Sequence, residues 1–280
     1  KYLDNSGEGL AVLCESFSSP TLMRLSKEFL KKYPKAQWVA YDSVSDENIY
    51  QGLNNATGSM AAPKYRLNDA KVILSLDSDF LQMESNDIEH SRDFATGRRV
   101  RSEEDSMNRL YVVEGAYSLT GGMADHRLRI QSGQVAMFVA ALATELGAQG
   151  LNIQAPEVNA SFDKKWIKAV AADLIANKGQ SLVLAGRRQP AHVHTLTALI
   201  NDVLSNTGKT VEYIVNPDRK VSDTDALVSL TKSMKQGKVE TLVILGGNPV
   251  YQAPSDLGFA SAMKQVAYSV HLSSHVDETS

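Results

Sequence analysis

Short apolar runs alternate along this chain with longer segments in which apolar residues recur at helical spacing. In the first such pair, a run at Leu10–Cys14 is followed by Ser19, a helix N-cap residue, and by Pro20, which suits a first helical turn. Apolar residues then recur at helical spacing as far as Tyr33. Further strands are predicted at residues 37–41, 71–76, 111–114, 181–185, 210–215, 240–245 and 266–272.

The order of these segments predicts the fold class. Strands that alternate with helices of this length form right-handed βαβ units around a parallel sheet. We therefore expect an α/β protein with two Rossmann-like lobes and mainly parallel sheets. The remaining helices are predicted at residues 46–54, 134–146, 163–177, 191–205 and 223–236.

The pattern is interrupted once, and this predicts the domain organisation. Residues 148–162 lack periodicity, and the alternation restarts after them. A chain of 280 residues is also long for one domain of typical size. We expect a first α/β lobe over residues 1–150 and a second over 151–280. Because the chain opens on Lys1 and stops after an acidic stretch, we also expect a domain excised from a longer protein.

Composition excludes several classes of function. The net charge is −3, and no stretch concentrates Lys and Arg, which argues against a nucleic-acid partner. No apolar run approaches the roughly 18 residues that span a bilayer, so direct membrane insertion is not expected. The single cysteine, Cys14, cannot form an intrachain disulfide or supply the four thiolates of a typical iron–sulfur cluster.

Candidate chemistry lies in the loops that follow strands, because ligands bind at the carboxyl ends of open parallel sheets. Gly246-Gly247-Asn248-Pro249 follows one strand, and its glycines would let the backbone approach a nucleotide or phosphate; a plain turn explains it equally. Asp77-Ser78-Asp79 would bind ribose hydroxyls or form a turn. The paired Arg187 and Arg188 would hold a phosphate or carboxylate, or lie in solvent.

Other recognisable sites are absent from the sequence. Residues 15–19 contain no G-x-G-x-x-G fingerprint after the first strand, and no P-loop or G-x-S-x-G elbow is present. A standard nicotinamide or flavin site is therefore not expected. His192 and His194 are two residues apart on a predicted helix and point to different faces. His271 and His275 are expected on an exposed tail rather than as metal ligands.

Two segments resemble the molybdopterin oxidoreductase superfamily. Residues 112–133 resemble its strand, loop and "A-D … P-G-T-D" segment, and Val243–Pro249 resembles its "G-x-N-P" strand end. In that family, two such lobes clasp a bis-pterin guanine dinucleotide cofactor. The resemblance implies a cleft near the carboxyl ends of the strands, with candidate cofactor-binding residues Asp77, Ser78, Gly246, Gly247, Asn248 and Pro249.

Departures from the family pattern argue against bound cofactor. Ser132-Gly133-Gln134-Val135 replaces Pro-Gly-Thr-Asp, so the acidic residue expected to bind guanine is missing. Residues 77–80 replace the "G-x-N-P" of the first lobe and place carboxylates where a pyrophosphate would approach, which is electrostatically unfavourable. We therefore interpret the cleft as a relic and expect no catalytic residue and no cofactor in this chain.

A longer set of segments is similar to the large iron–sulfur subunit of alternative complex III, namely residues 10–22, 33–42, 71–81, 118–121, 246–254, 269–272 and 277–279. This resemblance implies a quinol-oxidising respiratory complex on the periplasmic side of the bacterial inner membrane. Its iron–sulfur clusters would lie in a cysteine-rich module outside this chain.

The resulting hypothesis is a scaffold without activity of its own, which packs against other subunits of a membrane electron-transfer complex. Two alternatives remain open on the sequence. One is an oxidoreductase domain that binds molybdopterin guanine dinucleotide, and the other is a generic nucleotide-binding module.

Overall fold

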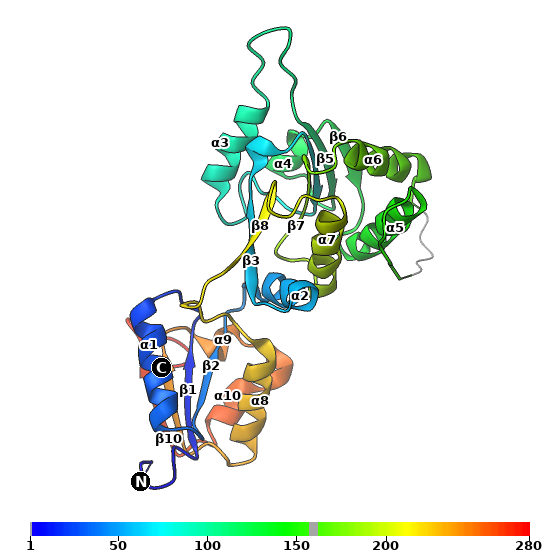
Figure 1. The fold of residues 1–280 in the computed structure, drawn as a ribbon. Helices are drawn as coiled ribbons and strands as arrows, with labels where there is room; N and C mark the ends of the chain where they lie inside the picture. The colour runs from blue at the N-terminus through cyan, green and yellow to red at the C-terminus, as the bar shows by residue number, and fades with distance from the viewer. Residues whose placement is uncertain (1, 157–161) are drawn as a thin grey trace. The chain divides into compact units, whose positions relative to one another are not determined.

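The computed structural model describes residues 2–156 and 162–280 of the chain. Over these residues it is an α/β structure with two four-stranded parallel sheets and one two-stranded antiparallel sheet (Figure 1). The predicted fold class, two α/β lobes with mainly parallel sheets, is confirmed. In the described ranges, no helix combines the length and the apolar character that a bilayer crossing requires.

The chain folds into two compact units. Unit 1 combines the residues up to Glu47 with Asn216–Ser280, and unit 2 is Asn48–Val215. The parallel sheet of unit 1 has the strand order β10-β9-β1-β2. Its strands are β1 (Leu10–Cys14), β2 (Gln37–Ala40), β9 (Thr241–Leu245) and β10 (Tyr268–Leu272).

Helices cover the two faces of this sheet to different extents. α1 (Pro20–Lys32) packs on one face, where Phe29 lies edge-on to Trp38 of β2 with ring centroids 5.4 Å apart. Ser19 caps this helix as predicted, because its hydroxyl accepts a hydrogen bond from Leu22 N. The opposite face packs against α8 (Thr224–Lys235) and α10 (Phe259–Met263), and the short α9 (Pro249–Gln252) follows β9.

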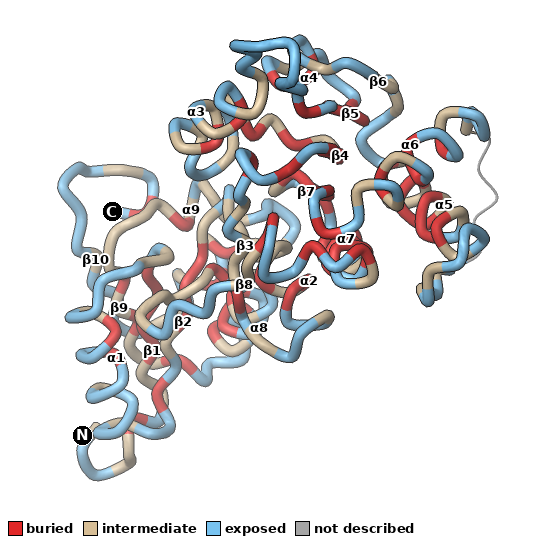
Figure 2. Tube along the Cα trace, turned by 45° about the horizontal axis from the view of Figure 1, so that its top comes forward, coloured by how far each residue is buried: buried red, intermediate tan, exposed pale blue. Residues whose placement is uncertain are grey.

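Unit 2 contains the second parallel sheet, in the order β6-β5-β4-β7. Alternate residues of β4 enter two cores: Leu74 packs with α5, α6 and α7, whereas Ile73 packs on the opposite face with Phe94 of α3. Figure 2 shows that β4 and β7 run through buried parts of the unit. An antiparallel pair, β3 with β8, completes the unit. The strands are β3 (Ala61–Tyr65), β4 (Val72–Leu76), β5 (Arg109–Glu114), β6 (His126–Arg129), β7 (Ser181–Ala185) and β8 (Val211–Val215), and the helices are α2 (Glu47–Thr57), α3 (Asp87–Gly97), α4 (Leu119–Gly122), α5 (Val135–Ala148), α6 (Lys164–Ala176) and α7 (Ala191–Val203).

The compact units differ from the predicted halves, 1–150 and 151–280. β7 lies in the second predicted half but pairs with β4 from the first, and β9 pairs with β1. Strand partners are chosen by packing between distant segments, so the loss of periodicity at 148–162 does not mark a boundary between sheets. Part of that stretch, residues 157–161, lies outside the described residues.

Side chains complete the hydrogen-bonding edge of β7 that faces no other strand. The buried Asn201 of α7 accepts a hydrogen bond from Val183 N at 3.0 Å and donates one to Val183 O at 2.7 Å, as a neighbouring strand would. Asn206 Nδ2 donates to the same Asn201 oxygen at 3.1 Å. This amide pair satisfies backbone groups that would otherwise be buried without partners.

We expect Asn201→Leu to lower the free energy of unfolding by about 3 kcal/mol, because it leaves the N–H and C=O of Val183 and the side-chain NH₂ of Asn206 unpaired in the core. Urea titration followed by circular dichroism measures this change. Asn55→Leu on an exposed position of α2 is the control, with an expected change close to zero. Equal stability of the two variants would contradict the assigned role of Asn201.

Candidate functional site

One carboxylate joins the carboxyl ends of the strands in unit 2. Asp77 follows β4 directly, with a left-handed φ of 53°. Its carboxylate accepts hydrogen bonds from Gly115 N at 3.3 Å, from Gln189 Nε2 at 2.8 Å and from the Ser132 hydroxyl. These partners follow β5, β7 and β6 respectively, so the four strand ends meet at one side chain. We call these four residues the Asp77 cluster.

The two residues after Asp77 form hydrogen bonds within the protein. Ser78 is buried, and its carbonyl accepts a hydrogen bond from Ser75 Oγ at 2.7 Å. Asp79 Oδ1 accepts from Thr120 N at 3.0 Å and from Thr120 Oγ1 at 2.7 Å. These bonds match the turn-forming interpretation of the acidic loop. They also occupy Asp79 Oδ1, an oxygen that binding of ribose hydroxyls would use.

A second carboxylate, which is buried, lies at the end of β5. Glu114 accepts hydrogen bonds from Arg127 Nε at 2.6 Å and from the Ser118 hydroxyl. The Arg127 guanidinium also lies over the Tyr117 ring, 4.8 Å from its centroid. Glu114 therefore holds the loop after β5 against β6.

Sequence reasoning missed Gln189, Ser132, Glu114 and Arg127 as members of this edge. Gln189 and Ser132 each stand in a loop after a strand, so the rule that selected Asp77 would also have found them. Glu114 ends a predicted strand, so the same rule applies to it, whereas Arg127 carried no such signal because it lies in β6, within a stretch that was expected to be a loop.

The backbone leaves no room for a side chain at Gly186, the residue after β7. A Cβ atom built there would lie 2.0 Å from the Asp77 carbonyl oxygen and 3.1 Å from Ser78 Cα. Gly186 thus permits the close approach of the two loops that carry the Asp77 cluster.

We expect Gly186→Ala to lower the free energy of unfolding by about 1–3 kcal/mol, because the methyl group must push two backbone segments apart. Gly133→Ala is the matched control, since no atom lies within 4 Å of a Cβ at that position. Thermal unfolding of both variants tests this. A Gly186→Ala protein as stable as Gly133→Ala would contradict the close approach.

The glycine loop of unit 1 is covered by the last residues of the chain. Gly246 and Gly247 both have left-handed φ values, 74° and 71°, which explains the need for glycine. Asn248 donates from its amide to Glu278, and its Oδ1 accepts from Thr279 Oγ1 at 2.7 Å and Thr279 N at 3.2 Å. Pro249 is the first residue of α9.

His271 of β10 belongs to the same covered loop. Its Nε2 lies 3.0 Å from the Gly247 carbonyl oxygen, and its Nδ1 lies 2.8 Å from Ser280 Oγ and 3.8 Å from Asp277 Oδ1. The Ser280 N–H lowers the pKa of Asp277. In the described ranges, no three His, Cys, Asp or Glu side chains gather as a metal site would require. The predicted site residues thus fall in two separate units, each group engaged by hydrogen bonds within its own unit.

An ion pair fixes the start of β6 in unit 2. Arg98 donates to both oxygens of Asp125, at 2.9 and 2.7 Å, and Leu110 N donates to Asp125 Oδ2 at 2.8 Å. Burial would raise the pKa of Asp125, but the Arg98 guanidinium and the Leu110 N–H outweigh it, so the pKa lies below its ordinary value.

Because the folded state depresses the pKa of Asp125, its contribution to stability is complete above the unfolded value of about 3.9 and is lost as pH falls through the folded value. We expect Asp125→Asn to be less stable than the wild type above about pH 5 and this difference to shrink below about pH 4. Urea unfolding between these limits measures it, with Asp256→Asn as an exposed control. A difference that does not depend on pH would contradict the ion pair.

The fold and its strand-end loops define an α/β protein of the open parallel-sheet class. No family model and no curated protein matches the sequence. Among solved structures, the chain is similar to one from the crystal structure of the formyltransferase/hydrolase complex FhcABCD of Methylorubrum extorquens with methylofuran. The TM-score is 0.57 at 12% sequence identity, over 98% of this chain and 76% of that one. At this identity the likeness shows a shared fold.

These comparisons correct the family expected from the sequence. The similar structure is a formyltransferase/hydrolase complex, and it is neither a molybdopterin oxidoreductase nor the large subunit of alternative complex III. The expected function, a scaffold of a respiratory quinol-oxidising complex with a molybdopterin or nucleotide module as alternatives, is wrong for the same reason. The expectation of partner subunits is supported in its general form, because the similar chain is part of a multi-subunit complex.

Proposed function

We propose that this chain is a subunit of a multi-subunit complex, and that a partner protein binds to an uncovered half of the parallel sheet in unit 1. The observation that carries the proposal is the exposure of apolar side chains on β10, the edge strand of that sheet. Membership of a complex is supported by the shared fold with a chain of FhcABCD over nearly the whole length of this protein.

The register of the sheet shows which side chains share a face. Trp38 pairs with Val12, Val12 pairs with Val243, and Val243 pairs with Val270. Residues paired in this way point to the same side of a sheet. Because α1 packs on Trp38 through Phe29, all of these residues face the α1 side.

α1 covers only the β1–β2 half of this face. On β10, Tyr268 is 71% exposed, Val270 59% and Leu272 68%. Val243 and Leu245 of β9 are half-buried beside them. We call this surface the open face, formed by Thr241, Val243, Leu245, Tyr268, Val270 and Leu272.

An open apolar half is unusual for a parallel sheet, because such sheets are normally covered by helices on both faces. The open face carries no charged side chain, so covering it requires no desolvation of a charge. The element that fits a twisted row of Val, Leu and Tyr beside α1 is a second helix with an apolar stripe. The proposed occupant is therefore an amphipathic helix of a partner subunit.

We expect Val270→Asp to separate the protein from its complex, because the partner helix would bury the new carboxylate without a partner charge. The fold should stay intact, because this position is exposed in the isolated chain. Ser269→Asp is the matched control: it adds the same charge to the neighbouring position of β10, on the opposite side of the sheet. The measurement is the native mass, by size exclusion with light scattering, of the tagged full-length protein purified from its own cells.

The wild type and Ser269→Asp should elute at the mass of an assembly, and Val270→Asp at the mass of the single chain. Hydrogen exchange of β10 should be slower in the assembly than in the isolated protein. A Val270→Asp protein that remains in the assembly, or a wild type that elutes alone, would refute the proposal.

A further inference from the structure

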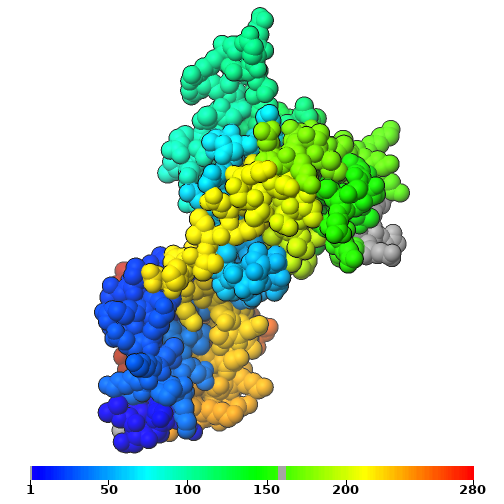
Figure 3. Space-filling model, viewed as in Figure 1, coloured from blue at the N-terminus to red at the C-terminus, as the bar shows by residue number. Residues whose placement is uncertain are grey.

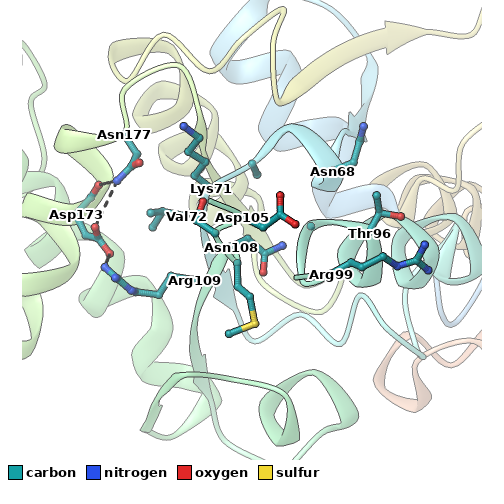
Figure 4. A pocket seen from close by; sticks show the side chains of 14 residues that line it. Asn68, Lys71, Val72, Thr96, Arg99, Asp105, Asn108, Arg109, Asp173 and Asn177 are labelled. Atoms are coloured by element: carbon teal, nitrogen blue, oxygen red, sulfur yellow. Dashed lines mark hydrogen bonds and ion pairs between the residues drawn. The ribbon is translucent and has the colours of Figure 1, made fainter. Parts of the chain in front are cut away.

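The polar pocket of unit 2 does not bring a set of ligand donors together. The pocket measures about 370 Å³ and opens at the amino ends of β4 and β5, and one of its walls is the segment between α3 and β5 that projects from the unit (Figure 3). Lys71 and Arg99 line it as exposed side chains that point away from each other, and Arg109 is paired with Asp173 at 2.7 Å (Figure 4). The outer edge of β10 in unit 1 is the stronger candidate for recognition.

β10 ends the sheet of unit 1, and its outer edge carries unpaired backbone groups. Tyr268 N donates to Glu240 O at 3.0 Å, and Leu272 O accepts from Gly246 N at 3.0 Å, so these residues direct their backbone groups toward β9. Successive residues of a strand alternate in this respect, so the N–H and C=O groups of Ser269 and His271 point outward. Within residues 2–156 and 162–280 these outward groups have no hydrogen-bond partner.

The outer edges of the other parallel strands are blocked within the described chain. At β2, Ala40 O accepts a hydrogen bond from Asp223 N at 2.9 Å. At β7, the amide of Asn201 occupies the edge. β6 carries Arg127 and Arg129, and charged side chains on an edge strand oppose pairing with another chain. β10 has neither a cover nor a Lys, Arg, Asp, Glu or Pro residue, so its edge is open to a further strand.

We propose that a second copy of this chain binds at this edge through its own β10. The two strands run antiparallel about a two-fold axis at Val270 and join the two sheets of unit 1 into one continuous sheet. This centre places Ser269 opposite His271 of the second copy, so residues with outward backbone groups face each other. Each of the two such pairs then exchanges two hydrogen bonds, as an antiparallel ladder requires.

The side chains of β10 are complementary to themselves in this register. Val270 faces Val270 of the second copy, and Tyr268 faces Leu272 of the second copy, which makes apolar cross-strand pairs on the α1 side of the sheet. No charged pair arises, because residues 268–272 contain no Lys, Arg, Asp or Glu. A two-fold contact requires such self-complementarity, and this favours a second copy over an unrelated strand. The pairing uses the edge of β10 and does not rest on the proposed partner helix, which would lie on the open face.

Cross-linking through a single introduced cysteine tests the register. In the proposed dimer the two Val270 Cα atoms lie about 4.5 Å apart, within the range of about 4.4–6.8 Å that a disulfide spans. The two Tyr268 Cα atoms lie about 14 Å apart, four residues along the strands, which is beyond that range. Val270→Cys and Tyr268→Cys are therefore matched variants on the same face of β10, and the native Cys14 is buried.

The full chain is purified without other subunits, oxidised mildly and followed on non-reducing gels. We expect Val270→Cys to form disulfide-linked dimers at least about tenfold faster than Tyr268→Cys, because the fold holds only the first pair of thiols together. Equal rates, or faster cross-linking of Tyr268→Cys, would overturn the proposed register.

A proline variant tests the edge without altering the open face. Ser269→Pro removes an outward N–H and leaves the hydrogen bonds to β9 in place, and proline is tolerated at such positions of edge strands. Ser269→Ala is the matched control. Sedimentation equilibrium of the isolated full chain should show dimers for the wild type and Ser269→Ala, and a dimer Kd at least about tenfold higher for Ser269→Pro, because two of the four hydrogen bonds are lost.

An isolated wild type that stays monomeric up to hundreds of micromolar overturns the proposal, as does a Ser269→Pro chain that dimerises like the wild type. If the isolated chain is monomeric but Ser269→Pro leaves the assembly purified from its own cells, the edge binds a strand of a partner subunit, and the second copy is again excluded. Ser269→Pro keeps every side chain of the open face, so these results are separate from those of Val270→Asp.

Discussion

Parallel pairing between strands that are distant in sequence is the constraint on which the rest of this structure depends. β1 pairs with β9 in unit 1, and β4 pairs with β7 in unit 2. Unit 2 is therefore inserted between the two parts of the chain that form unit 1. Because all strands of a parallel sheet end at the same edge, this pairing brings the loops after β4, β5, β6 and β7 together around Asp77. It also makes β10 an edge strand with one uncovered face.

Polar side chains in this protein mainly complete the backbone. Asn201 pairs with the edge of β7 as a strand would, Asp77 at the end of β4 binds groups that follow three other strands, and Asn248 binds the chain at Thr279.

The sequence motifs that led to the wrong family have a local explanation. Gly246 and Gly247 are required by left-handed backbone, and Asn248 and Pro249 stand at the start of a helix that follows a strand. Any strand, turn and helix with this geometry favours the same residue types. Short matches of this kind therefore indicate an open α/β sheet, and they carry little information about which ligand, if any, such a sheet binds.

The sequence by itself determined the fold class and many of the elements, because the spacing of apolar residues is a local property: the cap at Ser19 and the strands at Leu10–Cys14 and 181–185 follow from it. It did not predict β3, α3 or β6. It could not give the two units, since a strand carries no local signal of its partner. Tertiary structure alone decided that Gln189 and Ser132 meet Asp77, and that one face of β10 stays open. Each of these depends on segments that only packing brings together.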